Sequence, residues 1–426
     1  MQGKAFAYFK TETNPRNGLV ADKTAAGCPA SIAATGLALG CYPVAVERGL
    51  MARQTAIGRT LATLRFFRDS TQGTGPDATG YRGFYYHFLD IETGRRAWQC
   101  ELSSVDSAFL FAGMLMAAAY FAEDSADQRE IRELTQLLVG RAEWSWLLAA
   151  DGTIGHGWHP ESGFIPWRWQ GYCEAMIVYM LALGSPAHAV PSSAYTAWCS
   201  TYEWKRCYDI EFLYSAPLFT HQLSHVWIDF RGIQDAPMAA RGIDYFENSR
   251  RATLVQQRYA IDNPARFKGY CAHSWGVTAS DGPGPVTATI DGVERRFFGY
   301  EGRGAPFGLD DGTLSPWAVV ASLPFAPEIV MPTVDHFIHG LQLHVRHAYG
   351  FKASFNQTFA ARCDEMSTDG WVSPYFFGLN LGPIVLMVEN FRSGLPWRLM
   401  RDCPCIVEGL RRAGFAGGWL GAVSGS

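Results

Sequence analysis

The order of apolar and polar positions along the chain predicts a mainly helical protein. The strongest signal is an apolar run at residues 105–121, which follows two serines, Ser103 and Ser104, that can each cap a helix. Ser103 and Asp106 have the spacing of a capping box, with Asp in place of the usual Glu. Alanines and Gly113 within the run allow a close approach of neighbouring chain. We therefore expect a helix that packs tightly against its neighbours.

Other segments carry helical patterns with recognisable stops. The run at 129–150 ends at an Asp-Gly pair, and the run at 173–183 is followed by Gly184 and Pro186, two residues typical of helix C-termini. Weaker patterns extend the helical prediction to residues 44–67, 193–204, 238–257, 316–322 and 383–393.

Strand patterns are fewer and short. One lies at residues 84–89, and another at 286–290 is followed by an Asp-Gly turn. Nothing along the chain has the composition of a linker, so residues 1–426 are expected to form a single domain. Long helices joined by loops rich in Gly, Trp and His predict an all-α toroid or bundle with small β-hairpins at one end.

Composition narrows the class of protein. The 426 residues are 48% hydrophobic and 18% charged, which excludes a disordered chain. The net charge is −4, so the chain lacks the excess of basic residues that is typical of nucleic-acid-binding proteins, and nucleic acid is not an expected partner. Aromatic residues reach 14%, with 14 Trp. They are consistent with a large core and also with a site that stacks on sugar rings.

Neither a membrane nor a metal is expected as a partner. The uncharged apolar stretch at 107–122 is shorter than the ~20 residues of a membrane-spanning helix. The first residues lack the apolar centre of a signal peptide, so the sequence as written predicts a cytoplasmic protein, or a periplasmic one if a signal has been removed. The ten cysteines form no Cys-x-x-Cys pair, which argues against a zinc site.

Three acidic residues stand at predicted helix starts beside aromatic loops, namely Glu101, Asp106 and Glu174. Glycoside hydrolysis needs one carboxyl group as general acid and a second as base or nucleophile, and apolar surroundings suit the acid. An alternative interpretation is that acids in a first turn only complement the helix dipole. The pattern predicts candidate catalytic carboxyls without deciding between these two.

A second polar segment carries His221, His225 and Asp229 four residues apart, on one face if the segment is helical. Two histidines at this spacing can bind zinc, but Gln222 stands where the catalytic Glu of a His-Glu-x-x-His motif would be. A groove wall that binds hydroxyl groups and a set of buried core histidines are the other interpretations. All three remain open at this stage.

Several stretches, in order and nearly from end to end, resemble a known family. They are residues 12–15, 18–20, 84–90, 101–108, 174–186, 221–231, 245–249, 275–283, 322–328 and 389–394. The family is the bacterial glycoamylase-like family, which includes endo-β-1,2-glucanases and the transglycosylase domain of cyclic β-1,2-glucan synthases.

This resemblance implies an (α/α)6 toroid barrel with a cleft at one end, and hydrolysis of β-1,2-glucan without a metal or organic cofactor. It implies Glu174 as the general acid, and Glu101 or Asp106 as the base or nucleophile. Some relatives carry a further acid where this chain has Ser103, and tend to have Asp and Gln within the segment that is here 378–383.

On the same reasoning, the expected substrate is an oligosaccharide or a polysaccharide, and two sets of residues are expected to bind it. Four aromatic residues are expected to stack on sugar rings: Trp158, Trp169, Tyr172 and Trp275. Five polar residues are expected to bind hydroxyl groups: His221, Gln222, Asp229, Arg231 and Asp281. The alternatives are a β-1,2-glucan transglycosylase, an oligosaccharide-binding protein whose active site has decayed, and a polysaccharide lyase, which the shortage of basic residues in these segments disfavours.

Overall fold

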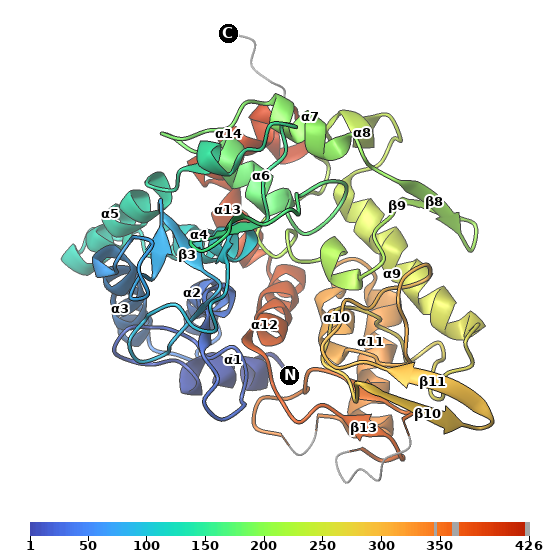
Figure 1. Ribbon diagram of the computed structural model, residues 1–426. Helices are drawn as coiled ribbons and strands as arrows, with labels where there is room; N and C mark the ends of the chain where they lie inside the picture. Colours follow the sequence, from blue (N-terminus) through green and yellow to red (C-terminus); the bar gives the residue numbers. More distant parts are fainter. Residues whose placement is uncertain (345–346, 360–365, 422–426) are drawn as a thin grey trace.

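The computed structural model describes residues 1–344, 347–359 and 366–421 (Figure 1). As predicted, helices predominate. The α-helices are α1 Gln2–Thr11, α2 Ile32–Glu47, α3 Arg53–Asp69, α4 Ser104–Tyr120, α5 Ala126–Gly140, α6 Met176–Leu183, α7 Ser193–Cys199, α8 Ala236–Ala239, α9 Tyr245–Asp262, α10 Pro316–Ala321, α11 Pro327–Asp335, α12 Gly378–Arg392, α13 Leu395–Arg401 and α14 Pro404–Arg412. Short 3-10 turns, η1 Trp144–Leu147, η2 Leu218–His221 and η4 Gly418–Leu420, and a π-turn, η3 His336–Gly340, add to these.

Five buried helices pack in succession around the centre of the molecule. Helix α2 contacts α4 and α12, α4 contacts α6, and α12 contacts α10. These helices are apolar on most sides, which is the pattern of a helix surrounded by protein. The more amphipathic α3, α5 and α14 lie outside them, α3 against α5 and α14 against α6. Figure 1 shows the inner helices surrounded by the outer ones.

The gap between α6 and α10 is bridged by the segment at 218–228, which is not an α-helix. It consists of η2 followed by irregular turns. The Ser224 hydroxyl accepts from the Ile177 N–H at 3.1 Å on the α6 side. On the α10 side, the Gln222 amide donates to the Ala318 carbonyl at 2.6 Å. These bonds make the segment a structural link between the two helices.

Glycines set the close contact between α2 and α4. A Cβ atom at Gly113 would lie 1.9 Å from the Gly36 carbonyl oxygen, and one at Gly36 would lie 2.3 Å from the Phe109 carbonyl oxygen. Any side chain at either position would push the two backbones apart. The expectation that Gly113 permits tight packing is thus confirmed.

Several predicted boundaries differ from the structure, and glycine explains two of them. The stretch at 44–67 divides into the end of α2 and most of α3, with Gly49 at a φ of 64° between them. The stretch at 238–257 divides between α8 and α9, with Gly242 at a φ of 65°. Both angles lie in the left-handed region that ends a helix. The stretch at 129–150 is α5 followed by η1.

The prediction of an all-α chain understated the β-structure. An antiparallel five-stranded sheet has the order β2 (Gly80–Tyr81), β3 (Phe84–Tyr86), β5 (Leu102–Ser103), β6 (Gly157–His159), β7 (Gly163–Phe164). Four two-stranded pairs add β1 (Ala30–Ser31) with β4 (Phe88–Leu89), β8 (Trp204–Cys207) with β9 (Ile210–Leu213), β10 (Val286–Ile290) with β11 (Val293–Phe297), and β12 (Phe355–Asn356) with β13 (Trp371–Val372). Such short strands leave little periodicity to detect.

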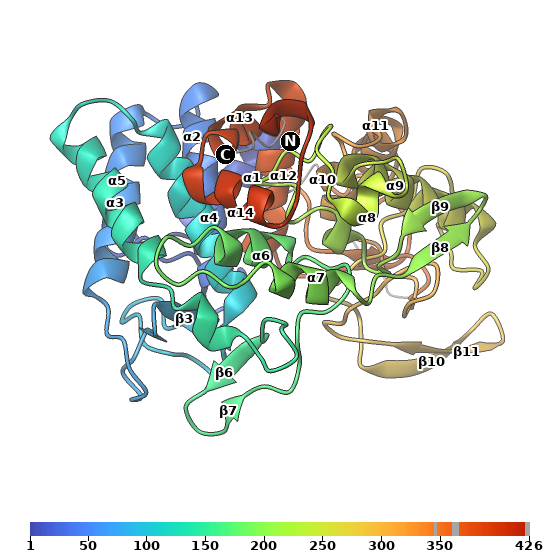
Figure 2. The same cartoon turned by 90° about the horizontal axis from the view of Figure 1, so that it is seen from above.

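Two of the hairpins lie at one end of the helices, as predicted. Figure 2 shows β6–β7 and β10–β11 on the same side of the helical layer, whereas β8–β9 lies at its edge beside α9. The predicted turn after β10 is present, with Asp291 and Gly292 both at positive φ. Within the described ranges, no helix combines the length and apolarity needed to cross a membrane.

Candidate active site

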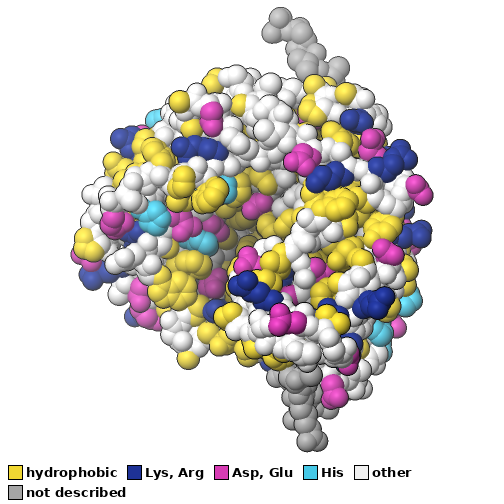
Figure 3. All heavy atoms as spheres, turned by 45° about the vertical axis from the view of Figure 1, so that its right-hand side comes forward, with side chains coloured by type: hydrophobic (Ala, Val, Ile, Leu, Met, Phe, Trp, Pro, Cys, Tyr) yellow, Lys and Arg dark blue, Asp and Glu magenta, His cyan; other side chains and the backbone are white. Residues whose placement is uncertain are grey.

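A cavity of about 380 Å³ opens where the inner helices begin. Its lining residues come from the N-terminal ends of α2, α4, α10 and α12, from the turn before α6, and from the loops beside them: Asp22, Lys23, Ser31, His87, Phe88, Trp98, Val105, Asp106, Phe109, Glu174, Phe219, Leu223, Ala279, Tyr300, Trp317, Phe377, Leu379 and Asn380. Helix N-termini carry partial positive charge and favour carboxylates. Figure 3 shows a hollow whose visible lining combines acidic, histidine and apolar side chains.

Asp106 is held at the start of α4 by the predicted serine cap. Ser103 is the N-cap residue, and its hydroxyl accepts from the Asp106 N–H at 3.2 Å. The same hydroxyl donates to the Asp106 carboxylate at 2.5 Å. The carboxylate therefore bonds the capping hydroxyl instead of the N-cap backbone of a standard capping box. Its orientation into the cavity is determined by α4 and by this bond.

The imidazole ring of His87 lies between the side chains of Glu101 and Asp106. Its Nδ1 lies 2.8 Å from Glu101 Oε1, and its Nε2 lies 3.6 Å from Asp106 Oδ2. Burial alone would lower the pKa of His87, but the charges of Asp106, Glu101 and Asp22 outweigh it and raise the pKa to about 9. Burial likewise opposes ionisation of Glu101, but the hydrogen bond and charge of His87 keep the pKa of Glu101 below its usual value. At neutral pH the group thus holds an imidazolium that is bonded to the Glu101 carboxylate and lies beside Asp106.

Donor atoms of His87, Glu101 and Asp106 all lie within 4.8 Å of one another, as in a metal site. The same three groups pair with one another, since the imidazole of His87 lies between the two carboxyl groups. An imidazolium carries protons on both nitrogens, so a metal ion would have to displace a proton from His87 to bind there. We therefore describe this group as an ion-pair cluster, and call it the His87 cluster.

Glu174 lies in the turn before α6 and lines the cavity. The helix begins at Met176, three residues later than the sequence pattern indicated, because Cys173 and Glu174 belong to this turn. Glu174 is half-buried, and its carbonyl accepts from the Ser224 hydroxyl at 2.8 Å. Burial, with a further contribution from the charge of Asp106, raises the pKa of Glu174 to about 7. A substantial fraction of this carboxyl is protonated at neutral pH.

The sequence pattern did not single out Asp22, which lines the same cavity. Burial raises the pKa of Asp22 to about 6, although the positive charges of His87 and Lys23 oppose the shift. Asp22 lies two residues after one of the stretches that matched the family, at residues 18–20, and that proximity was the one available signal. The cavity thus holds three carboxyl groups, of which two titrate near neutral pH.

Tyr300 also lines the cavity. The residue is 60% exposed, and its hydroxyl group lies close enough to the acids to be affected by their charges. Burial of the hydroxyl and the negative charges of Asp22, Asp106 and Asp281 raise the pKa of Tyr300 to about 12. The hydroxyl therefore keeps its proton and can donate a hydrogen bond to a ligand.

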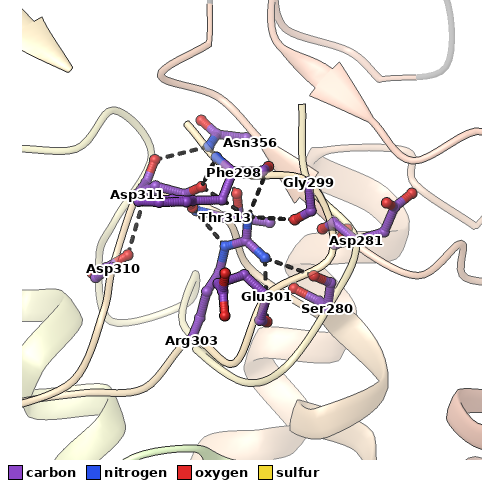
Figure 4. Close-up of polar contacts among 12 residues, drawn as sticks. Ser280, Asp281, Phe298, Gly299, Glu301, Arg303, Asp310, Asp311, Thr313 and Asn356 are labelled. Carbon is purple, nitrogen blue, oxygen red and sulfur yellow. Dashed lines mark hydrogen bonds and ion pairs between the residues drawn. The ribbon is translucent and has the colours of Figure 1, made fainter. Parts of the chain in front are cut away.

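A buried arginine positions the loops that carry Tyr300 and Asp281 (Figure 4). Arg303 has no exposed surface and pairs with both oxygens of Asp311, at 2.7 and 2.8 Å. Its remaining N–H groups donate to backbone carbonyls of the two loops, those of Ser280 at 2.6 Å, Phe298 at 3.0 Å and Gly299 at 3.0 Å. A fully paired buried ion of this kind rigidifies the chain around it.

The aromatic residues predicted to stack on sugar lie outside this cavity. Trp158 stacks on Tyr81, with ring centroids 5.0 Å apart. Trp169, which is buried, stacks on His156 at 3.6 Å and donates to the Ser104 hydroxyl at 2.8 Å. The cavity is instead lined by a different aromatic set, Phe88, Trp98, Phe109, Phe219, Tyr300, Trp317 and Phe377.

The other two predicted aromatic residues are also part of the core. Tyr172 packs against Tyr245, at a centroid distance of 5.7 Å, and against His221. Trp275 is fully buried and donates to the Thr333 hydroxyl at 2.8 Å. Of the predicted polar residues, Asp281 lies near the cavity, close enough to affect Tyr300, and accepts from the Ser373 hydroxyl at 2.7 Å.

In the segment from His221 to Arg231, both histidines form hydrogen bonds within the protein. His221 Nε2 lies 3.1 Å from the Ser215 carbonyl oxygen, and His225 Nε2 lies 2.9 Å from the Ser249 hydroxyl. Burial lowers the pKa of His221 to about 4 and that of His225 to about 3. This geometry corresponds to the buried-histidine interpretation.

The acid of that segment is also fully paired. Asp229 is buried and pairs with Arg231 at 2.7 Å and with Arg401. Burial opposes its ionisation, but the hydrogen bonds and charge of Arg231 keep the pKa of Asp229 below its usual value. Gln222 bonds α10, and Asp229 bonds Arg401 in α13, so these two side chains connect the segment to neighbouring helices.

The matching family model carries the description "Glycoamylase: Putative glucoamylase" and aligns with residues 166–404. A solved structure of a "putative glucoamylase" from Bacteroides uniformis ATCC 8492 superposes with a TM-score of 0.84 at 30% identity. That match covers 98% of this chain and 97% of the other. An endo-β-1,2-glucanase from Chitinophaga pinensis, solved with sophorotriose and glucose, shares the fold at a TM-score of 0.84 and 24% identity, over 98% of this chain and 97% of that one.

A curated protein also matches over nearly the whole chain. It is the exo β-1,2-glucooligosaccharide sophorohydrolase (non-reducing end) of Parabacteroides distasonis, 26% identical over 447 residues. The match covers 97% of this chain and 57% of that protein. The chain therefore spans little more than half the length of this relative.

Proposed function

The chain belongs to the glycoamylase family, and on that premise we propose that it is a glycoside hydrolase that cleaves β-1,2-linked glucooligosaccharides. One observation carries the proposal: a carboxyl group with a pKa near 7, Glu174, lines the same cavity as the ion-paired Asp106. The names of the Parabacteroides and Chitinophaga relatives support β-1,2-glucan as the substrate class.

In this proposal Glu174 is the general acid. Its raised pKa leaves a proton on the carboxyl group at neutral pH, available for the oxygen of the leaving sugar. Asp106 is the second carboxylate, which activates water or attacks the anomeric carbon. We assign this role to Asp106 rather than Glu101, because Asp106 lines the cavity whereas Glu101 is bonded to His87. Glu101 and His87 then act as positioning residues.

The substrate would lie between an aromatic and a polar wall. Trp98 and Phe88 offer flat apolar surfaces for sugar rings, whereas Trp317, which also lines the cavity, is buried. Tyr300 and Asn380 present groups that bond hydroxyls. A cavity of about 380 Å³ is within the usual range for small ligands. No metal or organic cofactor enters this scheme.

The architecture supports the same assignment. We propose that α2, α4, α6, the segment 218–228, α10 and α12 are the six inner elements of an (α/α)6 toroid, formed as one domain by residues 1–426. The support is the succession of contacts among these elements and the bonds of Ser224 and Gln222 to both flanking helices. The substrate cavity then lies at the end where the inner helices begin.

The test compares the wild type with Glu174→Gln on linear and cyclic β-1,2-glucans, with β-1,3-glucan, β-1,4-glucan and starch as other substrates. We expect new reducing ends from the β-1,2 substrates alone, and a loss of ~10³-fold or more in Glu174→Gln. Glu328→Gln is the matched control, because Glu328 stands in the first turn of α11, away from the cavity.

The products distinguish the remaining alternatives. Chromatography that shows longer or cyclic products would indicate transglycosylation. Binding of oligosaccharide by calorimetry without any release of reducing ends would indicate a binding protein. Full activity of Glu174→Gln would overturn the assignment of the general acid.

A further inference from the structure

A second cavity, of about 820 Å³, lies on the outer side of the helices. We call it the outer cavity. Side chains of α4 and α5 form one wall, Gly184 at the end of α6 forms the base, and residues 402–405, which connect α13 to the first turn of α14, form the other wall. It shares no described lining residue with the candidate active site. Nothing in the proposed hydrolysis uses it.

Two cysteine side chains meet in the wall of the outer cavity. Cys403 is the N-cap residue of α14 and is buried, and Cys405 is half-buried one residue into the helix. Their Sγ atoms lie 3.6 Å apart. Pro404 stands between them at the first helical position, where its ring restricts the backbone. The two sulfurs are therefore held side by side by a stiff turn.

The surroundings favour a thiolate on this pair. The nine-residue helix α14 directs its unpaired N–H groups toward its N-cap residue. A hydrogen bond from the Cys405 thiol, together with the N–H groups of Ile406 and Cys405, lowers the pKa of the Cys403 thiol although burial opposes this. The pKa of the Cys405 thiol is raised, because its proton bonds the neighbouring sulfur.

The outer cavity is the route by which a small molecule can reach the two sulfurs. Both cysteines line it, together with two cations, Arg132 and Arg412, and two acids, Asp402 and Glu408. A small disulfide with charges of both signs, such as oxidised glutathione, can pair with these groups. A dithiol with close sulfurs and a stabilised thiolate in the wall of a cavity has the features of a reactive pair.

We propose that Cys403 and Cys405 form a redox-active dithiol that small disulfides convert reversibly into an intramolecular disulfide. The Cys403 thiolate attacks one sulfur of the small disulfide, and the bond between its two sulfurs breaks to release one thiolate. The Cys405 sulfur then attacks Cys403 in the mixed disulfide, and the second small thiol leaves. The two protein thiols lose two electrons and two protons, and the small disulfide gains them as two thiols.

A disulfide across a single intervening residue is strained, so it is readily reduced again. The pair is thus suited to reversible oxidation and unsuited to permanent cross-linking. The proposal stands apart from the proposed hydrolysis, and its test needs no substrate.

The experiment treats the folded chain with oxidised glutathione, alkylates the remaining thiols under denaturing conditions and digests with trypsin. Cleavage after Arg401 and Arg411 yields one peptide, residues 402–411, that holds both cysteines and no other. We expect this peptide to lose two hydrogens and to escape alkylation, and dithiothreitol to reverse both changes. A peptide with both thiols alkylated would overturn the proposal.

Two variants sharpen the result. Cys405→Ser lacks the resolving thiol, so we expect it to keep one glutathione on Cys403. Cys271→Ser is the control, because Cys271 is exposed and lies in another peptide, and the change at 402–411 should persist in it. If Cys405→Ser fails to fold, phenylarsine oxide, which binds close dithiols, tests the wild type directly. Failure of the arsenical to protect residues 402–411 from alkylation would also overturn the proposal.

Discussion

Two groups of histidines and acids in this chain have opposite electrostatic states. In the His87 cluster, burial is outweighed by nearby carboxylates, and the pKa of His87 rises to about 9. In the segment of His221, His225 and Asp229, burial dominates, and the pKa values of the two histidines fall to about 4 and 3. The residue types are the same in both groups.

The partners of the acids explain the difference. Asp229 is neutralised by Arg231 and Arg401, so it contributes little charge to the histidines. Glu101 and Asp106 have His87 as their cationic neighbour, and Asp106 opens into the cavity. A charged cluster beside a cavity is suited to chemistry, and a neutral buried one is suited to packing. The sequence spacing alone highlighted the packing group.

The largest expected effects come from the two aspartates. Asp106→Asn should lower kcat by ~10²–10⁴-fold, because it removes the second carboxylate of the reaction, and it should also remove part of the stability that comes from the charge of His87. Asp229→Asn should reduce the free energy of unfolding by about 2 kcal/mol and spare the activity of the folded fraction, because it removes the charge-assisted hydrogen bonds to Arg231 and Arg401. Steady-state kinetics and urea unfolding measure both quantities. A larger loss of kcat in Asp229→Asn than in Asp106→Asn, together with a larger loss of stability in Asp106→Asn, would refute the comparison.

The histidines should follow the same division with smaller effects. His87→Gln should lower kcat by about 10²-fold and move the acid limb of the pH–rate profile to higher pH, because the carboxylates lose their cation. His225→Gln should keep the wild-type profile and lose about 1 kcal/mol of stability with the Ser249 hydrogen bond. An unchanged pH profile in His87→Gln would contradict its positioning role.

The two groups of histidines should make the stability of the protein depend on pH in opposite directions. The raised pKa of His87 contributes stability that is full below 6.5 and is lost as the pH rises toward 9, on the order of 2 kcal/mol. The lowered pKa values of His221 and His225 contribute stability that is full above 6.5 and is lost as the pH falls toward 4 and 3. Urea unfolding over this range should show a flatter alkaline limb in His87→Gln and a flatter acid limb in His225→Gln. Parallel curves for all three proteins would contradict both shifts.

The smallest expected effect is at the rim of the cavity. Tyr300→Phe should raise KM about 3- to 10-fold with little change in kcat, because it removes one hydrogen-bonding group that faces the substrate. Tyr208→Phe is the control, since its hydroxyl bonds Asp262 at 3.2 Å and lies outside the cavity lining. A similar KM change in the control would indicate a general effect of lost tyrosine hydroxyls.

Local signals predicted local features well. The serine cap at Ser103, the helix after it and the turn after β10 are present, because each depends on a few neighbouring residues. Glu174 and Asp106 were both expected as catalytic carboxyls, and both line the cavity. Their roles stay predictions.

Contacts between distant segments were not predictable in the same way. His87 lies in a predicted strand, but it is the residue at which the chain leaves β3 and enters β4, in a different sheet. Its position beside Glu101 and Asp106 results from the pairing of β3 with β5. The four aromatic residues chosen for sugar stacking looked equivalent to Trp98 and Trp317 in sequence, and only the fold decides which of them line the cavity.

The sequence by itself determined the helical character of the chain, the caps and turns, the family and two of the cavity carboxyls. Each of these follows from short-range pattern or from residues that recur in order. The tertiary structure decided which polar groups carry charge, because a pKa depends on burial and on charges brought together from distant segments. It also decided which tryptophans face the cavity, and that Arg303 positions the loops around Tyr300. These properties arise only when separate segments share one space.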